Sequence, residues 1–125
     1  MSIELVMGGF YTCHQEGHDP VHIWIGRVDL PSDLGRDARQ PVASLVVTTG
    51  LPDMPVMSHA PFWESAAFDG EMSVAAPFEV DQAAFDMQHA VWLMAWENDE
   101  ASAWSLTPNE AYASMISDMR EGLKG

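Results

Sequence analysis

The segment VHIWIGRVDL, residues Val21–Leu30, alternates apolar side chains with others along most of its length. Val21, Ile23 and Ile25 therefore fall on one face of an extended chain, and Trp24 falls on the other. A period of two residues is typical of a β-strand. This segment predicts a strand, and the segments on either side extend it into a sheet.

Three further segments are rich in strand-forming residues. Residues Ile3–His14 contain β-branched and aromatic side chains without helical periodicity, and the turn-forming sequence QEGHDP joins them to Val21 as a hairpin. Residues Val42–Gly50 include a nearly continuous apolar run, which predicts a buried third strand. Residues Glu71–Val80 are the candidate for a fourth strand, although their alanines disfavour it.

Proline is frequent in the connections that follow. The polar segment Leu30–Pro41 predicts an exposed loop. Three prolines occur from Pro52 to Pro61, and each removes a backbone donor and favours an extended residue before it. A short helix over Pro61–Phe68 is expected next, because proline is favoured at the first helical position.

The C-terminal half carries helical signals. Asp81 is a residue type that caps helix N-termini, since its carboxylate accepts from free amides of the first turn. After it, Phe85, His89, Trp92 and Trp96 recur at the spacing of one helical face. The segment predicts a helix that buries an aromatic stripe.

A second helix is expected to begin at the sequence TPNE, Thr107–Glu110, which is a capping box with proline at its first helical position. Gly122 is expected to end this helix. The residues expected to face inward are Tyr112, Met115, Ile116 and Met119.

These segments predict one α+β domain over residues 1–125, with an antiparallel sheet of three to four strands from the N-terminal half packed on one face by two C-terminal helices. Helices that follow the strands, instead of alternating with them, argue against a doubly wound parallel sheet. Leu93 and Met94 widen the apolar surface of the first helix. This helix is therefore expected to pack on two sides within the domain, and the alternative is a homodimer through the Phe85–Trp96 helix.

Charge is the strongest compositional signal, because nineteen Asp and Glu against five Lys and Arg give a formal net charge of −14. No Lys or Arg occurs from Gln40 to Met119, a segment with twelve acids that we term the acidic window. This field repels phosphates, which argues against direct nucleic-acid binding and against an anionic membrane surface. It attracts a basic protein partner, unless the acids serve solubility alone. The candidate partner-binding residues are Glu64, Asp69, Glu71, Asp99 and Glu100.

The compartment is expected to be the cytoplasm. The single cysteine, Cys13, has no partner for an internal disulfide. No apolar run reaches the length of about 18 residues that spans a bilayer, and the first residues lack the basic flank of a signal peptide. No cofactor is expected, because the sequence contains no GxGxxG, Walker A or EF-hand pattern.

Candidate metal ligands surround the hairpin turn, where His14, His18 and His22 recur every four residues beside Cys13. A glycine and a proline inside this interval disfavour a helix, on which the three imidazoles would share a face. On a hairpin, a turn centred on His18 places His14 opposite His22, and a shift of half a residue places Cys13 opposite His22. Polar residues that decorate a turn are the favoured interpretation, and a metal site is the alternative.

The candidate catalytic residues are His59 and His89. His89 lies on the aromatic stripe, and a buried, hydrogen-bonded imidazole is the favoured interpretation. If His59 of the proline-rich segment meets His89 in a cleft, the pair suits general acid–base chemistry. The sequence contains no GxSxG elbow that would indicate a serine hydrolase.

No motif in the sequence identifies a family or a reaction. The leading hypothesis is a non-enzymatic binding or regulatory module that acts on a basic protein partner, for instance as an inhibitor that mimics nucleic-acid charge. The alternative is a small metal-dependent or acid–base enzyme that uses the hairpin histidines with His59 and His89. The first hypothesis predicts clustered exposed carboxylates, and the second predicts a pocket in which imidazoles converge.

Overall fold

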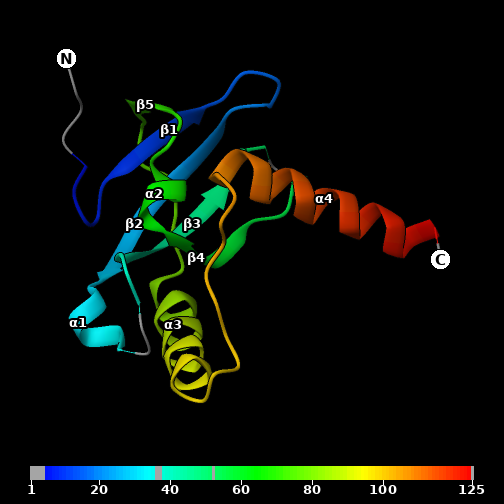
Figure 1. The fold of residues 1–125 in the computed structure, drawn as a ribbon. Helices are drawn as coiled ribbons and strands as arrows, with labels where there is room; N and C mark the ends of the chain where they lie inside the picture. The colour runs from blue at the N-terminus through cyan, green and yellow to red at the C-terminus, as the bar shows by residue number, and fades with distance from the viewer. Residues whose placement is uncertain (1–4, 36–37, 52, 125) are drawn as a thin grey trace.

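The computed structural model describes residues 5–35, 38–51 and 53–124, with side chains as far as residue 122, as an α+β fold (Figure 1). In this part of the chain, one sheet contains the strands β1 (Phe10–His14), β2 (Val21–Asp29), β3 (Val42–Thr48), β4 (Met57–Trp63) and β5 (Glu71–Val74). The helices are α1 (Pro31–Leu34), α2 (Glu64–Ala67), α3 (Gln82–Glu97) and α4 (Pro108–Lys124). Among the described residues, we find no helix that combines the length and the apolar composition of a membrane span.

Neighbouring strands of the sheet are antiparallel throughout, in the order β4-β3-β2-β1-β5. β1 to β4 follow one another as a meander, and β5 returns to the other edge of β1, where Tyr11 pairs with Val74. The prediction of an antiparallel sheet is therefore confirmed, but the sheet has five strands instead of three to four.

The prediction of a helix that begins at Pro61 is wrong. Pro61 lies inside β4, and α2 begins three residues later at Glu64. β4 is an edge strand, where a residue without a backbone N–H is tolerated. The outer side of β4 is joined by Trp104, whose backbone N–H donates to the Pro61 carbonyl at 2.8 Å.

Two other predicted segments differ in their limits. The first strand begins at Phe10 rather than Ile3, because residues 7 and 8 form a turn before it, and residues 3 and 4 lie outside the described residues. The expected loop Leu30–Pro41 contains the single helical turn α1, and residues 36 and 37 of that loop are likewise outside the described residues.

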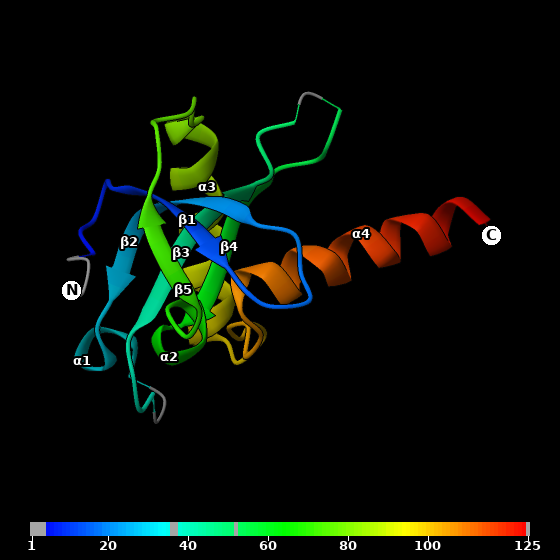
Figure 2. The same ribbon diagram turned by 90° about the horizontal axis from the view of Figure 1, so that it is seen from above.

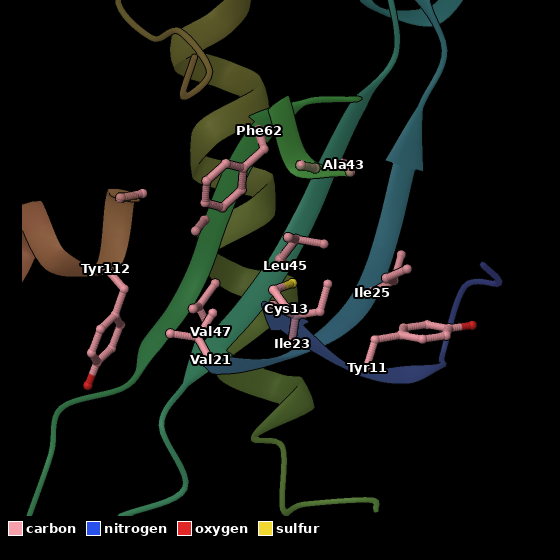
Figure 3. Packing of buried hydrophobic residues seen from close by; sticks show 13 residues of the cluster. Tyr11, Cys13, Val21, Ile23, Ile25, Ala43, Leu45, Val47, Phe62 and Tyr112 are labelled. Atoms are coloured by element: carbon pink, nitrogen blue, oxygen red, sulfur yellow. The ribbon is translucent and has the colours of Figure 1, made fainter. Parts of the chain in front are cut away.

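One face of the sheet packs against α2 and the beginning of α4. Ile23, Leu45 and Phe62 contribute to this core together with Ala111 and Tyr112 of α4. Figure 3 shows these strand side chains gathered on one face, with Tyr112 approaching from the helix. The start of α4 is therefore part of the hydrophobic core.

A buried amide fixes the beginning of α4 to the hairpin. Asn109 Nδ2 donates to the carbonyl oxygens of Cys13 and Asp19, each at 3.0 Å. The Cys13 carbonyl belongs to the end of β1, and the Asp19 carbonyl belongs to the connection between β1 and β2. These bonds orient the first turn of α4 against the sheet.

The opposite face of the sheet is covered by α3. Phe85 of this helix packs with Trp24 and Val46, whose side chains point away from those of Ile23 and Leu45. A Cβ at Gly26 would lie 2.3 Å from Phe85 Cζ, so glycine allows the helix to approach the bulge in β2. The predicted stripe is confirmed as buried at Phe85, His89, Trp92 and Trp96.

The prediction that both C-terminal helices pack on one face of the sheet is wrong, because α3 and α4 contact opposite faces. Every residue of β3 is buried, and a strand buried on both sides needs cover on both sides. The apolar run that predicted a buried strand is therefore explained by a sheet that lies between helices on both of its faces.

Both predicted helix starts are confirmed. Asp81 Oδ1 accepts from the Ala84 backbone N–H at 3.0 Å. At the start of α4, Glu110 Oε1 accepts from the Thr107 backbone N–H at 3.0 Å, and Thr107 Oγ1 accepts from the Glu110 backbone N–H at 3.2 Å. The second pair of bonds is a complete capping box.

The predicted end of the last helix is wrong. α4 continues through Gly122 to Lys124, and Met119 is exposed instead of facing inward. The described side chains from residue 117 onward are exposed, and this part of α4 extends away from the rest of the fold (Figures 1 and 2). The helix is longer than the sheet surface on which it packs.

Candidate functional site

The register of β1 and β2 separates the hairpin histidines. Thr12 pairs with His22 and Cys13 pairs with Val21, so both registers considered from the sequence are wrong. The turn is centred on Gly17, which has a φ of 84°, in the left-handed region that glycine adopts without a steric penalty. The observed register differs by two residues from the one that would pair His14 with His22, and by one residue from the one that would pair Cys13 with His22. Neither pair of candidate ligands therefore forms.

Each candidate metal ligand has its own surroundings. The Cys13 thiol lies in the core on the α4 side of the sheet, and burial raises its pKa to about 12. His14 and His22 lie on the other face, and each imidazole has a hydroxyl group within hydrogen-bond distance, at 3.1 and 2.9 Å respectively. His18 is exposed in the turn. Among the residues that the structure describes, no group of three or more His, Cys, Asp or Glu side chains is placed to hold a metal ion.

His59 and His89, by contrast, lie next to each other. His59 is on β4 and His89 is on α3, and their ring centroids are 5.6 Å apart. His89 Nε2 donates to Asp29 Oδ2 at 2.8 Å, and His59 Nε2 lies 3.2 Å from Ser44 Oγ. Four elements of the fold thus build one polar group, which we term the histidine cluster: Asp29, Ser44, His59 and His89.

Sequence reasoning missed Asp29. The residue is the last of β2, near the end of the segment from which the fold was predicted, and an acid beside an apolar strand was the signal available there. Its partner His89 is 60 residues away, so no local pattern connects them. Arg27 Nε also lies 3.5 Å from Asp29 Oδ1, which places a second donor on the same carboxylate.

The histidine cluster is closed to solvent over most of its atoms. His89 has an exposed fraction of 4%, Asp29 of 6% and Ser44 of 0%. A substrate cannot reach the Ser44 hydroxyl or the His89–Asp29 pair in this conformation. The cluster satisfies the hydrogen bonds of buried polar groups between α3 and the sheet, so its geometry favours a structural role.

His59 is the most accessible member and has a shifted pKa. Burial lowers its pKa to about 4, with repulsion from His89 acting in the same direction and attraction to Asp29 acting against it. The imidazole is therefore neutral at pH 7. A neutral imidazole can accept a proton. The ring of His59 lies among aromatic side chains, however, because its centroid is 5.2 Å from that of Phe85 and 6.2 Å from that of Trp92.

The shifted pKa of His59 predicts a specific loss of stability in mild acid. The unfolded chain, with the ordinary pKa of 6.5, binds a proton before the folded protein does. The free energy of unfolding should therefore fall as the pH drops from 6.5 towards 4, by about 1 kcal/mol between pH 7 and pH 5 after allowing for solvent screening of this partly buried ring.

Urea denaturation at both pH values, for the wild type and for His59→Gln, measures this contribution as the difference between the two proteins. His18→Gln, which removes an exposed imidazole outside the cluster, is the control. An equal pH-dependent loss in the wild type and in His59→Gln would show that His59 is protonated equally in both states.

The outer surface of α3 carries an apolar stripe that the fold leaves uncovered. Met87, Val91 and Met94 have exposed fractions of 64%, 62% and 65%. Ala90 is also exposed between them, and residues at this spacing share one helical face. We term these four residues the α3 stripe. The expectation that α3 packs on two sides within the domain is wrong for this face, although Leu93 is partly buried as expected.

Most acids of the acidic window are exposed, and many lie along α3. Ten of its twelve acids are exposed, whereas Glu64 and Glu110 are half-buried. Six of these ten lie on α3 or in the segments that flank it: Glu79, Asp81, Asp86, Glu97, Asp99 and Glu100. The chain thus concentrates exposed carboxylates around one helix.

The five partner-binding candidates fall into two groups. Glu64 begins α2, Asp69 lies in the turn after it, and Glu71 begins β5. Asp99 and Glu100 follow the end of α3, next to the α3 stripe along the chain. Sequence reasoning missed Asp86 and Glu97, whose signal was that they are acids within an otherwise largely apolar helix.

The surface also contains pockets that the sequence did not predict. A pocket of about 290 Å³ lies along α4, between the hairpin turn and the β3–β4 loop, with Tyr112, Ile116 and Arg120 in its wall. A wider hollow of about 600 Å³ adjoins the segment before α3 and is lined by Val46 and Ser58 among others. Neither pocket is lined by His59 or His89.

Comparisons with protein-family models, with curated proteins and with solved structures find no match to this chain.

Proposed function

We propose that this protein is a non-enzymatic binding module that recognises a basic protein partner through the outer surface of α3. The observation that carries this proposal is the exposure of six carboxylates on and around α3, within a segment that contains no Lys or Arg. Concentrated charge of one sign attracts an oppositely charged partner and accelerates its association. An inhibitor that competes for a nucleic-acid-binding groove is one form that such a module takes.

The histidine enzyme is the second candidate, because His59 and His89 do converge. Its support is smaller, since the Ser44 hydroxyl and the His89–Asp29 pair are buried. A catalytic base must come within hydrogen-bond reach of its substrate, and only His59 of the cluster is partly accessible. The exposed acids of α3 need no opening of the fold to meet a partner.

Charge reversal at α3 tests the binding proposal. The test variant carries Asp86→Lys, Glu97→Lys and Glu100→Lys. The matched variant reverses three exposed acids outside α3 and its flanking segments: Glu16→Lys, Asp53→Lys and Asp118→Lys. Each substitution replaces a negative charge with a positive one and so raises the net charge by two. Both variants therefore have a formal net charge of −8 where the wild type has −14.

The partner is first captured from a lysate on the immobilised wild type and identified, and association and dissociation rates are then measured with the purified partner. The wild-type association rate should fall about tenfold from about 0.01 M to about 0.1 M ionic strength, because the screening length falls from about 30 to about 10 Å. The α3 variant should lose most of the rate, and the matched variant should lose less. Equal losses would assign the effect to net charge alone, and recovery of no basic protein beyond that on an unrelated acidic domain would refute the proposal.

A further inference from the structure

The α3 stripe is an apolar surface that the fold does not use. α3 packs on the sheet through its opposite side, where Phe85, His89 and Trp92 are buried. Apolar side chains scattered singly on a surface are normal, but neighbouring ones form a patch. Met87, Val91 and Met94 follow one another at helical spacing and are each more than three-fifths exposed. Hydration of this patch is a cost that a partner would remove.

Carboxylates border the α3 stripe along one edge. Asp86 and Glu97 are separated by about three helical turns, so they lie on the same line along the helix, beside the stripe. Both side chains are exposed. The surface therefore combines an apolar centre with a negatively charged border.

The end of α3 strengthens this negative potential. The last turn of the helix contains no basic residue, and Asp99 and Glu100 follow Glu97 after the single residue Asn98. The C-terminus of a helix already carries partial negative charge, so acids there are unfavourable for the isolated helix. A cationic group of a partner would be attracted by the carboxylates and by the helix terminus together.

This charge pattern selects the kind of occupant. A second copy of the chain would bring Asp86, Glu97 and a further net charge of −14 to the same surface. An anionic membrane would be repelled for the same reason. A basic helix with one apolar side would instead place Lys and Arg opposite the carboxylates and bury its apolar side chains on the stripe. The methionines suit this role because their flexible side chains adapt to different apolar surfaces.

We propose that the α3 stripe binds a basic amphipathic helix of a partner protein, with apolar side chains on Met87, Val91 and Met94 and with cationic side chains along Asp86 and Glu97. This inference rests on the proposed function and specifies how the basic partner is recognised. It adds an apolar contact to the electrostatic attraction, so binding depends on the pattern of the partner's residues as well as on its charge.

The test uses two synthetic peptides of identical Leu and Lys composition. One has leucines at helical spacing on a single side, and the other has the same residues permuted so that no apolar side exists. The stripe variant carries Met87→Gln, Val91→Gln and Met94→Gln. The matched variant removes three exposed apolar side chains elsewhere: Met7→Gln, Leu51→Gln and Met119→Gln. Because all six side chains are exposed, both variants should fold.

Fluorescence anisotropy should show that the wild type and the matched variant bind the amphipathic peptide more tightly than the permuted one. The stripe variant should bind the amphipathic peptide at least about tenfold more weakly than the wild type. Circular dichroism of each variant confirms that its fold is intact, and an unrelated acidic domain measures binding by charge alone.

Equal binding of the two peptides to the wild type, or undiminished binding by the stripe variant, would overturn the inference while leaving recognition by charge in place. Absence of peptide binding above the unrelated domain would also overturn it, and the charge-reversal experiment would then decide the proposed function separately. Dimerisation of the wild type that the stripe variant abolishes would assign the surface to a second copy instead. Stripe-dependent binding to vesicles of neutral lipid, without preference for the amphipathic peptide, would assign it to a membrane.

Discussion

Asp29→Ala is expected to lower the free energy of unfolding by about 3–5 kcal/mol, because it leaves His89 buried without the carboxylate that accepts its hydrogen bond. The penalty arises from the partner that remains, since a buried polar group without a hydrogen bond pays its full desolvation cost. Urea denaturation of the purified variant at pH 7, with the midpoint and the m-value both fitted, measures this loss.

Asp33→Ala is the matched control, because Asp33 is an exposed acid four residues away. The double variant Asp29→Leu with His89→Phe should recover much of the stability, since replacing both partners with apolar groups leaves no unpaired donor. Asp29→Asn, which keeps an acceptor oxygen, covers the case in which Asp29→Ala does not fold, and it should be the milder substitution. An Asp29→Ala midpoint equal to that of the wild type would contradict the buried pair.

Trp96→Ala is expected to cost a similar amount, about 3–5 kcal/mol, because it removes a buried aromatic side chain and leaves a cavity. Trp96 packs edge-to-face on Trp63 with centroids 5.8 Å apart, and its Nε1 donates to the Leu34 carbonyl at 3.0 Å. The substitution thus loosens α3 from β4 and from α1 at once. The same denaturation measurement detects the loss.

Trp96→Phe separates the two contributions of this side chain. It keeps most of the apolar contact and removes the donor to Leu34, so it should cost less than Trp96→Ala. Met94→Ala, two residues earlier on the exposed side of α3, is the control and should change stability little. A Trp96→Ala variant as stable as the Met94→Ala control would contradict the packing of α3 on the sheet.

Local patterns predicted the elements whose signals are local. The capping box at Thr107, the cap at Asp81 and the buried stripe of α3 depend on residues within a few turns of one another, and the structure confirms all three. β4 could not be predicted in this way. Its proline indicates a helix start when only neighbouring residues are considered, and it is acceptable in a strand only because β4 lies at the edge of the sheet.

The residues of the candidate site show the same difference between local signals and long-range contacts. His59 and His89 were recognised from residue type, but their contact and the pairing of His89 with Asp29 join β4, α3 and β2. The hairpin histidines had a regular spacing, yet their separation depends on a turn centred on Gly17 instead of on His18. Register and long-range contact depend on which chain segments pair, and neither is encoded in the spacing of the residues.

Periodicity, capping and composition are properties of short segments, so the amino-acid sequence was enough to predict the strands β2 and β3, the starts of both C-terminal helices, the buried face of α3 and the excess of negative charge. That α3 and α4 cover opposite faces of the sheet, and that Met87, Val91 and Met94 stay exposed, depends on how the elements are arranged in space. Burial requires two surfaces that meet. An apolar residue shows that it gains by being covered, but only the arrangement of the other elements determines whether anything covers it.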